Sequence, residues 1–335
     1  MLCLGLGSTA AHAAVPSAVQ VTAASPPVYP VSYPAPLQVI EGLGSGITID
    51  QVAALPSERF VIFSPSKLYT VGFDAPLWLK LKVSVPQALP QSPWLLEFPS
   101  IIVDRYEYYQ RDAAGRWRMA AAGDRVAHVQ WPVDGLRARF QLPSNVAGDQ
   151  DVFVRVVHQH HTNLQPVIVL QSHAVARDSS QMLWTGLLLG VVFTLVLTCA
   201  QMTLVYRDWT YGWYAGYLTF TMLAALCYSG IAQRSLWPDA SKFASDAIVY
   251  AVMTAFIFNL EFSRSMFGGL QSRAMRWLSR VLVGLCACYL IATFLSDRYD
   301  RLIVLFEVLS LLFSHLLCLR LQRPGAAAWC LVAIG

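Results

Sequence analysis

The stretch LWTGLLLGVVFTLVLTCAQMTLV, residues 183–205, decides the architecture of this chain. It holds no charged residue, and as a helix it is long enough to cross about 30 Å of hydrocarbon, which takes roughly 20 residues. Further apolar runs follow at 210–232, 247–266, 277–295 and 302–320, and another begins at 326. We therefore expect residues 182–335 to form transmembrane helices, with five complete and a sixth begun.

The composition agrees with a membrane protein that also carries a water-facing part. Of the 335 residues, 56% are hydrophobic and 13% are charged, whereas soluble domains carry nearer a quarter charged residues. The apolar excess lies beyond a boundary near residues 179–181. The net charge of +4 is spread along the chain without a Lys/Arg block, which argues against a nucleic-acid partner.

Both ends of the chain carry a signal of their own. A short apolar stretch precedes Ala11-His12-Ala13, so residues 1–14 are predicted to be the remnant of a secretory signal peptide, with a disordered N-terminus as the alternative. Residues 15–37 are rich in Pro, Ala and Ser and are predicted to be a linker. Residues 326–335 are too few to cross a membrane, so we expect the chain to be truncated there.

Residues 38–178 show the alternation that is typical of half-buried strands. Leucine and valine alternate with Trp78, Lys80 and Lys82, and again with Phe153 and Arg155. The sequence Asp112-Ala113-Ala114-Gly115 separates two such runs and predicts a hairpin turn. About eight strands in ~140 residues favour an all-β sandwich or jelly roll. Residues 4–198 hold no cysteine, so this domain must be stabilised by its core rather than by disulfides.

The loops between the apolar runs suggest an orientation. If the β domain is exported, the first helix runs inward. Seven arginines then lie in the inner loops and adjoining helix ends, against four basic residues in the outer ones. This bias follows the positive-inside rule and agrees with a β domain on the outer side of the membrane.

Small and ionisable residues within the apolar runs are candidates for helix packing and for function. Gly186 with Gly190, and Gly212 with Gly216, form two GxxxG pairs, which support either packing within one chain or a homodimer. Glu261, Glu307 and His315 are ionisable and are expected to face the interior of the bundle. They could form a proton relay, or they could make hydrogen bonds between helices or lie near helix ends.

The β domain offers two groups of candidate ligand-binding residues. Trp78, Trp117 and Trp131 could present flat apolar faces to a sugar-like ligand, with packing within the sheet as the alternative. His158 and His160 extend the face of Val152, Val154 and Val156 and could share a zinc ion only if a third ligand were nearby. A polar strand end is the simpler interpretation of these histidines, so we expect no metal site.

The order of these motifs resembles a known family. The segments that carry the resemblance are Val71-Gly72-Phe73 with Leu77-Trp78-Leu79-Lys80-Leu81, Leu95-Leu96-Glu97-Phe98-Pro99-Ser100 with Val103-Asp104-Arg105-Tyr106-Glu107-Tyr108-Tyr109, Phe153-Val154-Arg155-Val156, and Tyr206-Arg207-Asp208 with Tyr214, Tyr217, Gly230 and Leu236-Trp237-Pro238. Together with Gly186 and Gly190 they are similar to the bacterial 7TM receptors with diverse intracellular signalling modules, in the branch with the type 2 extracellular domain. Lys80 departs from the family pattern, where arginine is usual.

This resemblance implies a jelly-roll sensor similar to carbohydrate-binding modules, a seven-helix bundle whose last part is missing here, and a cytoplasmic output module. We therefore expect a receptor for an extracytoplasmic small molecule that signals to a histidine kinase or diguanylate cyclase module outside this chain. No cofactor motif and no catalytic motif occurs, so we expect no enzyme activity from this chain. A transporter or channel with an accessory domain, and a membrane-bound enzyme, are the alternatives.

Overall fold

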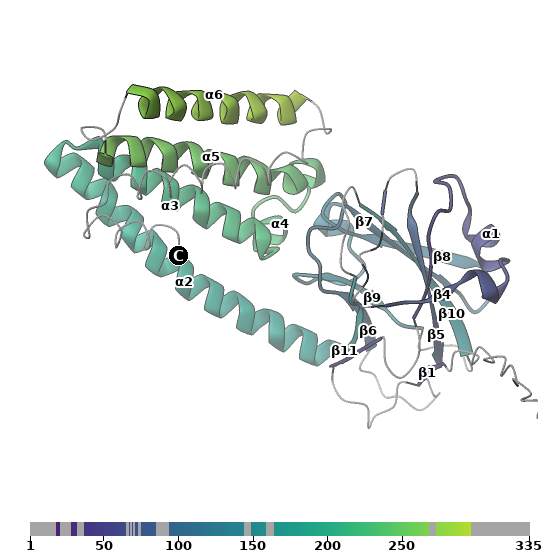
Figure 1. Cartoon of the computed structure of the whole chain (residues 1–335). Coiled ribbons are helices and arrows are strands. Elements are labelled where there is room, and N and C mark those ends of the chain that lie inside the picture. The colour runs from purple at the N-terminus through teal and green to yellow at the C-terminus, as the bar shows by residue number, and fades with distance from the viewer. Residues whose placement is uncertain are drawn as a thin grey trace, which may run out of the picture. The chain divides into compact units, whose positions relative to one another are not determined.

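The computed structural model describes residues 18–20, 28–31, 37–64, 67, 69, 71–72, 75–84, 94–143, 149–158, 164–267 and 273–295. Figure 1 shows strands in the N-terminal part and helices in the C-terminal part. The contacts divide the chain into two compact units. The first comprises Met1–Gly123 and Gln130–Ala174, and the second comprises Asp124–Val129 and Val175–Gly335. The predicted signal peptide, residues 1–14, lies outside the described residues.

The larger sheet of the first unit has the strand order β4-β3-β5-β10-β7-β8, with β1 pairing in parallel with β5. The strands are β1 (Val19–Gln20), β3 (Gln38–Ile40), β4 (Val61–Ile62), β5 (Leu77–Ser84), β7 (Arg105–Arg111), β8 (Trp117–Ala122) and β10 (Asp149–Val157). The central strand β10 pairs antiparallel with β5 on one side and with β7 on the other. Among the described strands, β8 pairs with β7 alone and forms an edge of the sheet.

The smaller sheet packs against the inner face of the larger one. Its strands are β2 (Val28–Pro30), β6 (Trp94–Phe98), β9 (Ala138–Gln141) and β11 (Val167–Leu170), in the order β2-β11-β6-β9. Aromatic rings join the two sheets: Phe98 stacks on Tyr106 at 4.3 Å between centroids, and Tyr108 stacks on Phe140 at 5.0 Å. The predicted β-sandwich is therefore confirmed.

The segment predicted to be a linker contributes to both sheets. Within residues 15–37, β1 adds to the larger sheet beside Val83 and Ser84, and β2 pairs with β11 in the smaller sheet. A composition rich in Pro and Ala gave no alternation to detect. A strand can pair with a sheet without such an alternation of apolar and polar residues, because the main chain supplies the hydrogen bonds.

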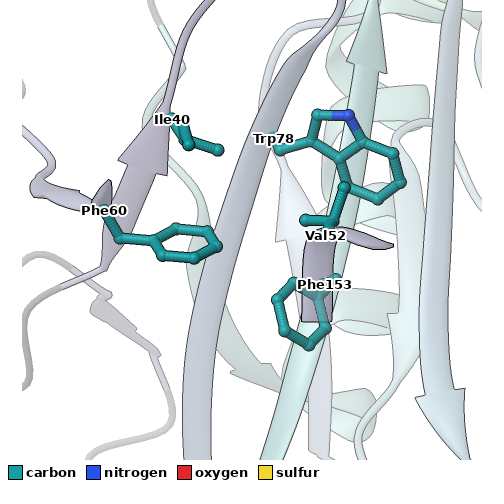
Figure 2. Packing of buried hydrophobic residues seen from close by; sticks show 5 residues of the cluster. All are labelled: Ile40, Val52, Phe60, Trp78 and Phe153. Atoms are coloured by element: carbon teal, nitrogen blue, oxygen red, sulfur yellow. The ribbon is translucent and has the colours of Figure 1, made fainter. Parts of the chain in front are cut away.

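One short helix covers part of the outer face of the larger sheet. The helix α1 (Ile49–Ala53) is followed by the 3-10 turn η1 (Ser57–Arg59). It begins with a capping box, in which Thr48 and Gln51 exchange hydrogen bonds between side chain and backbone. Figure 2 shows the small core beneath it, where Val52 lies beside the two aromatic side chains of the sheet; the cluster consists of Ile40, Val52, Phe60, Trp78 and Phe153.

The second unit consists of helices that follow the predicted apolar runs. They are α2 (Gln171–Tyr206), α3 (Trp209–Tyr228), the short α4 (Ile231–Ser235), α5 (Ser241–Phe267) and α6 (Arg273–Leu295). Within the described part of the chain, three helices are long and apolar enough to cross a membrane: α2, α5 and α6. The predicted runs at 302–320 and from 326 lie outside that part.

The helix α2 begins earlier than expected. Its first residue, Gln171, follows directly after β11, whereas the apolar run that predicted this helix starts at residue 183. Its first three turns carry polar residues such as Arg177 and Asp178, so hydropathy alone could not include them. The strand domain is thus continuous with a 36-residue helix, without an intervening loop.

The two predicted GxxxG pairs lie in different surroundings. Gly216 on α3 faces α5 so closely that a Cβ atom there would lie 2.1 Å from the ring of Phe258. A Cβ atom added to Gly212 would lie 3.3 Å from the side chains of Thr203 and Trp209. A Cβ atom added to Gly186 or Gly190 on α2 would meet no described atom within 4 Å other than those of its own helix turn. The second pair therefore supports packing within the chain, as the simpler of the two predicted roles requires.

Candidate functional site

A pocket of about 540 Å³ opens on the outer face of the larger sheet, within the first unit. Its walls come from the turn of the β7–β8 hairpin, from the adjoining ends of β5 and β10, and from α1. The residues that matter most for its chemistry are Lys82, Arg111, Asp112, Trp117, Asp151 and Phe153. This volume lies in the range of small-molecule sites, about 300–1,000 Å³.

Trp117 forms the aromatic side of the pocket and is held by three partners. Its indole Nε1 donates a hydrogen bond to the Asp50 carboxylate at 3.0 Å. Its ring meets Phe153 edge-on at 5.7 Å between centroids, and the Arg111 guanidinium lies over it at 4.6 Å. The indole is partly exposed, so it can offer a rigid apolar surface to a ligand.

The hairpin turn that lines the pocket is organised by one carboxylate. The Asp112 side chain accepts hydrogen bonds from the backbone N–H groups of Ala114 and Arg116, both at 2.9 Å, and Gly115 takes a positive φ of 76°. The backbone hydrogen bond from Arg116 is the largest of the effects that hold the Asp112 pKa below its usual value. The turn predicted at residues 112–115 is therefore present, and its carboxylate is ionised at neutral pH.

The charges around the pocket are paired with one another. Lys82 binds Asp149 at 3.0 Å, and Lys80 binds Asp151 at 3.1 Å. Hydrogen bonds from Lys82 and then Ser84 hold the pKa of the Asp149 carboxyl below its usual value. Because each carboxylate has a cationic neighbour, the pocket presents many hydrogen-bonding groups without a strong field of either sign.

An ion network centred on the buried Glu107 lies on the same face of the sheet. Glu107 accepts a hydrogen bond from Arg155 at 3.0 Å and from the Tyr109 hydroxyl at 2.9 Å, and Arg105 lies 2.8 Å away. Burial alone would raise the Glu107 pKa, but these partners hold it below its usual value. Burial, together with Glu107, raises the pKa of Tyr109 to about 12. This network fixes the central strands that carry one wall of the pocket.

The three predicted tryptophans do not form one platform. Trp117 lines the pocket, whereas Trp78 is only 1% exposed and stacks on Tyr109 beneath α1. The alternation placed Trp78 on the outer face correctly, but a helix that the alternation could not indicate covers that face. Trp131 is buried and belongs neither to the pocket lining nor to the cluster beneath α1.

His158 directly follows β10, at the end of that strand away from the pocket. It is buried, with its Nδ1 atom 3.5 Å from the Asp104 carboxylate. The distance along the strand from Phe153 is more than about 15 Å at roughly 3.3 Å per residue. His160 lies outside the described residues. Among the residues that the structure does describe, no group of three or more His, Cys, Asp or Glu side chains could hold a metal ion.

Of the ionisable residues predicted within the membrane, the structure describes Glu261. It lies near the C-terminal end of α5 and forms an ion pair with Arg264, which is in the last turn. This placement agrees with the predicted alternative of a position near a helix end. Glu307 and His315 lie outside the described residues.

Sequence reasoning missed most of the residues that line the pocket. Lys82, Arg111, Asp149 and Asp151 appear in the sequence as ordinary polar positions of strands, and only strand pairing brings them together. Asp50 could have been found earlier, because Thr48 and Gln51 have the spacing of a capping box and predict a helix start.

Comparison with protein families gives two matches that together span most of the chain. A family model described as 7TM diverse intracellular signalling matches residues 181–334. A second model, described as 7TMR-DISM extracellular 2, matches residues 36–170. The boundary between the two matches falls where β11 ends and α2 begins. No curated protein matches the chain.

Proposed function

Because the chain belongs to the 7TM receptors with diverse intracellular signalling, carrying the type 2 extracellular domain, we propose that it senses a carbohydrate-like small molecule in the pocket beside Trp117. The family makes it a membrane protein with sensory receptor domains and an N-terminal extracellular domain. The observation that carries the ligand proposal is the combination of a partly exposed indole with paired charges in one pocket.

The chemistry of the pocket favours a neutral ligand rich in hydroxyl groups. A sugar ring has an apolar face that stacks on an indole, and hydroxyls that both donate and accept hydrogen bonds. The carboxylates of Asp149 and Asp151 can accept from such hydroxyls, while Lys82 and Arg111 can donate to them. A strongly charged ligand would instead have to displace an existing ion pair, such as Lys82 with Asp149.

The remaining parts of the proposal follow from the family and from the orientation of the helices. The β domain faces the periplasm, the helices cross the bacterial inner membrane, and the signal passes to a cytoplasmic module of the histidine kinase or diguanylate cyclase type. A homodimer would allow two such modules to meet. Support for this orientation comes from the excess of arginine in the predicted inner loops.

Isothermal titration calorimetry of the detergent-solubilised chain tests the ligand proposal. The probes are neutral mono- and disaccharides, with a uronic acid and an amino acid as charged comparisons. We expect a neutral saccharide to bind, and we expect Trp117→Ala to weaken it at least about tenfold. Met119→Ala is the matched control, because Met119 is exposed on the same strand and does not line the pocket. Equal affinity in wild type and Trp117→Ala would exclude this pocket.

A further inference from the structure

We propose that the β7–β8 hairpin is the element that links the pocket to the helices, and that the segment Asp124–Val129 with the side chain of Gln233 is its contact point. The inference rests on the proposed function, because it assigns a route to the signal from that pocket. Its first observation is one of chain order. The turn of the hairpin lines the pocket, and the segment Asp124–Val129 directly beyond its other end belongs by its contacts to the helical unit.

The strand β8 is paired with β7 along its whole length, from the pocket to the far end of the hairpin. Six cross-strand pairs run from Tyr106 with Ala122 to Arg111 with Trp117. At the far end, Gly123 lies against the backbone just before β7, where a Cβ atom would be 2.6 Å from the carbonyl oxygen of Asp104. This close approach ties the exit of β8 to the start of β7. From Trp117 to Gly123 the strand spans about 20 Å at roughly 3.3 Å per residue.

The segment Asp124–Val129 is anchored within the helical unit by its backbone. The Gln233 side chain on α4 is buried, and its Nε2 atom donates to the carbonyl oxygens of Asp124 at 3.3 Å and Val126 at 3.4 Å. The His128 N–H donates to the carbonyl oxygen of Pro238, just beyond α4, at 2.7 Å. Because these hydrogen bonds involve backbone groups of the segment, they fix its position and do not depend on which side chains it carries.

The short helix α4 also contacts α2 through the next residue. Arg234 donates a hydrogen bond from Nη1 to the Met182 sulfur at 3.7 Å. Gln233 and Arg234 are consecutive, so one turn of helix holds both the segment after β8 and the helix that continues β11. Movement of the segment Asp124–Val129 is therefore passed to the first transmembrane helix through a single short element.

The physical consequence is a coupling that must act in both directions. Suppose that ligand binding at Trp117 shifts the equilibrium between docked and undocked arrangements of the segment Asp124–Val129. A substitution that undocks the segment must then change the free energy of the hairpin turn by the same amount. This reciprocity allows a test without any ligand, because substitutions at each end can replace the ligand as the perturbation.

Hydrogen–deuterium exchange of the full chain in nanodiscs measures both directions. Gln233→Ala removes two hydrogen bonds to the segment, so we expect the peptide that covers residues 124–130 to exchange about tenfold faster. We also expect faster exchange at the hairpin turn, residues 110–118. Gln130→Ala is the matched control, since Gln130 is an exposed glutamine beside the same segment. In the reverse direction, Trp117→Ala should change exchange of residues 124–130 at least about threefold, and Met119→Ala should not.

The outcomes separate this inference from the proposed function. Unchanged exchange of residues 124–130 in Trp117→Ala overturns the coupling, even if a saccharide binds at the pocket. The result expected on the inference is a change at both ends, which supports the coupling even if no saccharide binds and the ligand proposal fails. Equal exchange in Gln233→Ala and Gln130→Ala overturns the contact point.

Discussion

Replacement of Gly123 by alanine should destabilise the β domain more than any other single glycine substitution in its described part. Gly123 has a φ of 139°, which side-chain-bearing residues rarely adopt. An added Cβ would also meet three backbone atoms: the Asp104 carbonyl oxygen at 2.6 Å, and the Arg105 Cα and Val103 carbonyl oxygen at 2.9 Å. Backbone atoms inside a paired hairpin cannot turn aside as a flexible side chain can.

Two costs add at this position. Backbone strain at an unfavourable φ costs about 1–3 kcal/mol, and forcing a methyl group into filled space costs about 1–3 kcal/mol. We therefore expect a loss of about 4 kcal/mol. With a urea m-value of about 2 kcal/mol/M for a domain of this size, the unfolding midpoint should fall by about 2 M.

Pulse proteolysis of the full chain in detergent, across a urea series, measures that midpoint for the β domain. Gly115→Ala is the matched control, because Gly115 has a φ of 76° but no atom within 4 Å of the added Cβ. It should cost only about 1 kcal/mol, the price of the left-handed backbone. If both variants shift the midpoint equally, the close approach at Gly123 contributes nothing and the reasoning from steric contact is refuted.

Three further predictions concern other parts of the chain. Gly216→Val should lower the thermal midpoint of the helical unit by several degrees, because the side chain would meet Phe258 on α5, whereas Gly186→Val should leave it unchanged; circular dichroism in detergent distinguishes them. The β domain should lose stability as pH falls below about 4, because a carboxyl whose pKa is depressed in the folded state, such as Asp112, stabilises the fold only while it is ionised. In Asp112→Asn the free energy of unfolding should fall less steeply over this pH range, as measured by urea titrations at several pH values. Arg139→Leu should cost about 3–5 kcal/mol because it leaves Glu97 buried without its 2.8 Å partner, while the double variant with Glu97→Leu should recover most of that loss in the same assay.

The sequence predicted the sandwich well because the strands carry period-2 alternation. Leu77, Leu79 and Leu81 are fully buried, and the opposite face carries the charged Lys80 and Lys82, as expected. Tyr106 and Tyr108, which lie two residues apart on β7, are likewise buried in the core. Alternation assigns a face to each residue, but it cannot say what covers that face. Trp78 was therefore a candidate for ligand binding, with packing within the sheet as the alternative, and α1 covers it.

The pocket could not be predicted because its walls are joined by pairing between distant strands. Asp151 lies opposite Lys82 across β10 and β5, although they are far apart in the sequence. The hairpin turn was predictable because Asp112 and Gly115 act locally on their own backbone. Trp117 lies two residues beyond that turn and packs against Phe153 on β10, so it joins the hairpin turn to the paired strands of the site.

The position of the pocket in the sheet gives its two walls different roles. Phe153 and Asp151 lie on β10, which pairs with a strand on each side and is further held by the Arg155–Glu107 network. Trp117 lies on β8, which among the strands that the structure describes pairs only with β7 and can shift with fewer hydrogen bonds lost. A ligand that bridges the two walls can move the edge strand only by as much as its affinity differs between the two arrangements. Reversing a 1:99 balance between the two arrangements takes a difference in binding free energy of about 5.5 kcal/mol. Substitutions on β10 should therefore weaken binding, whereas substitutions on β8 should also change the size of the response.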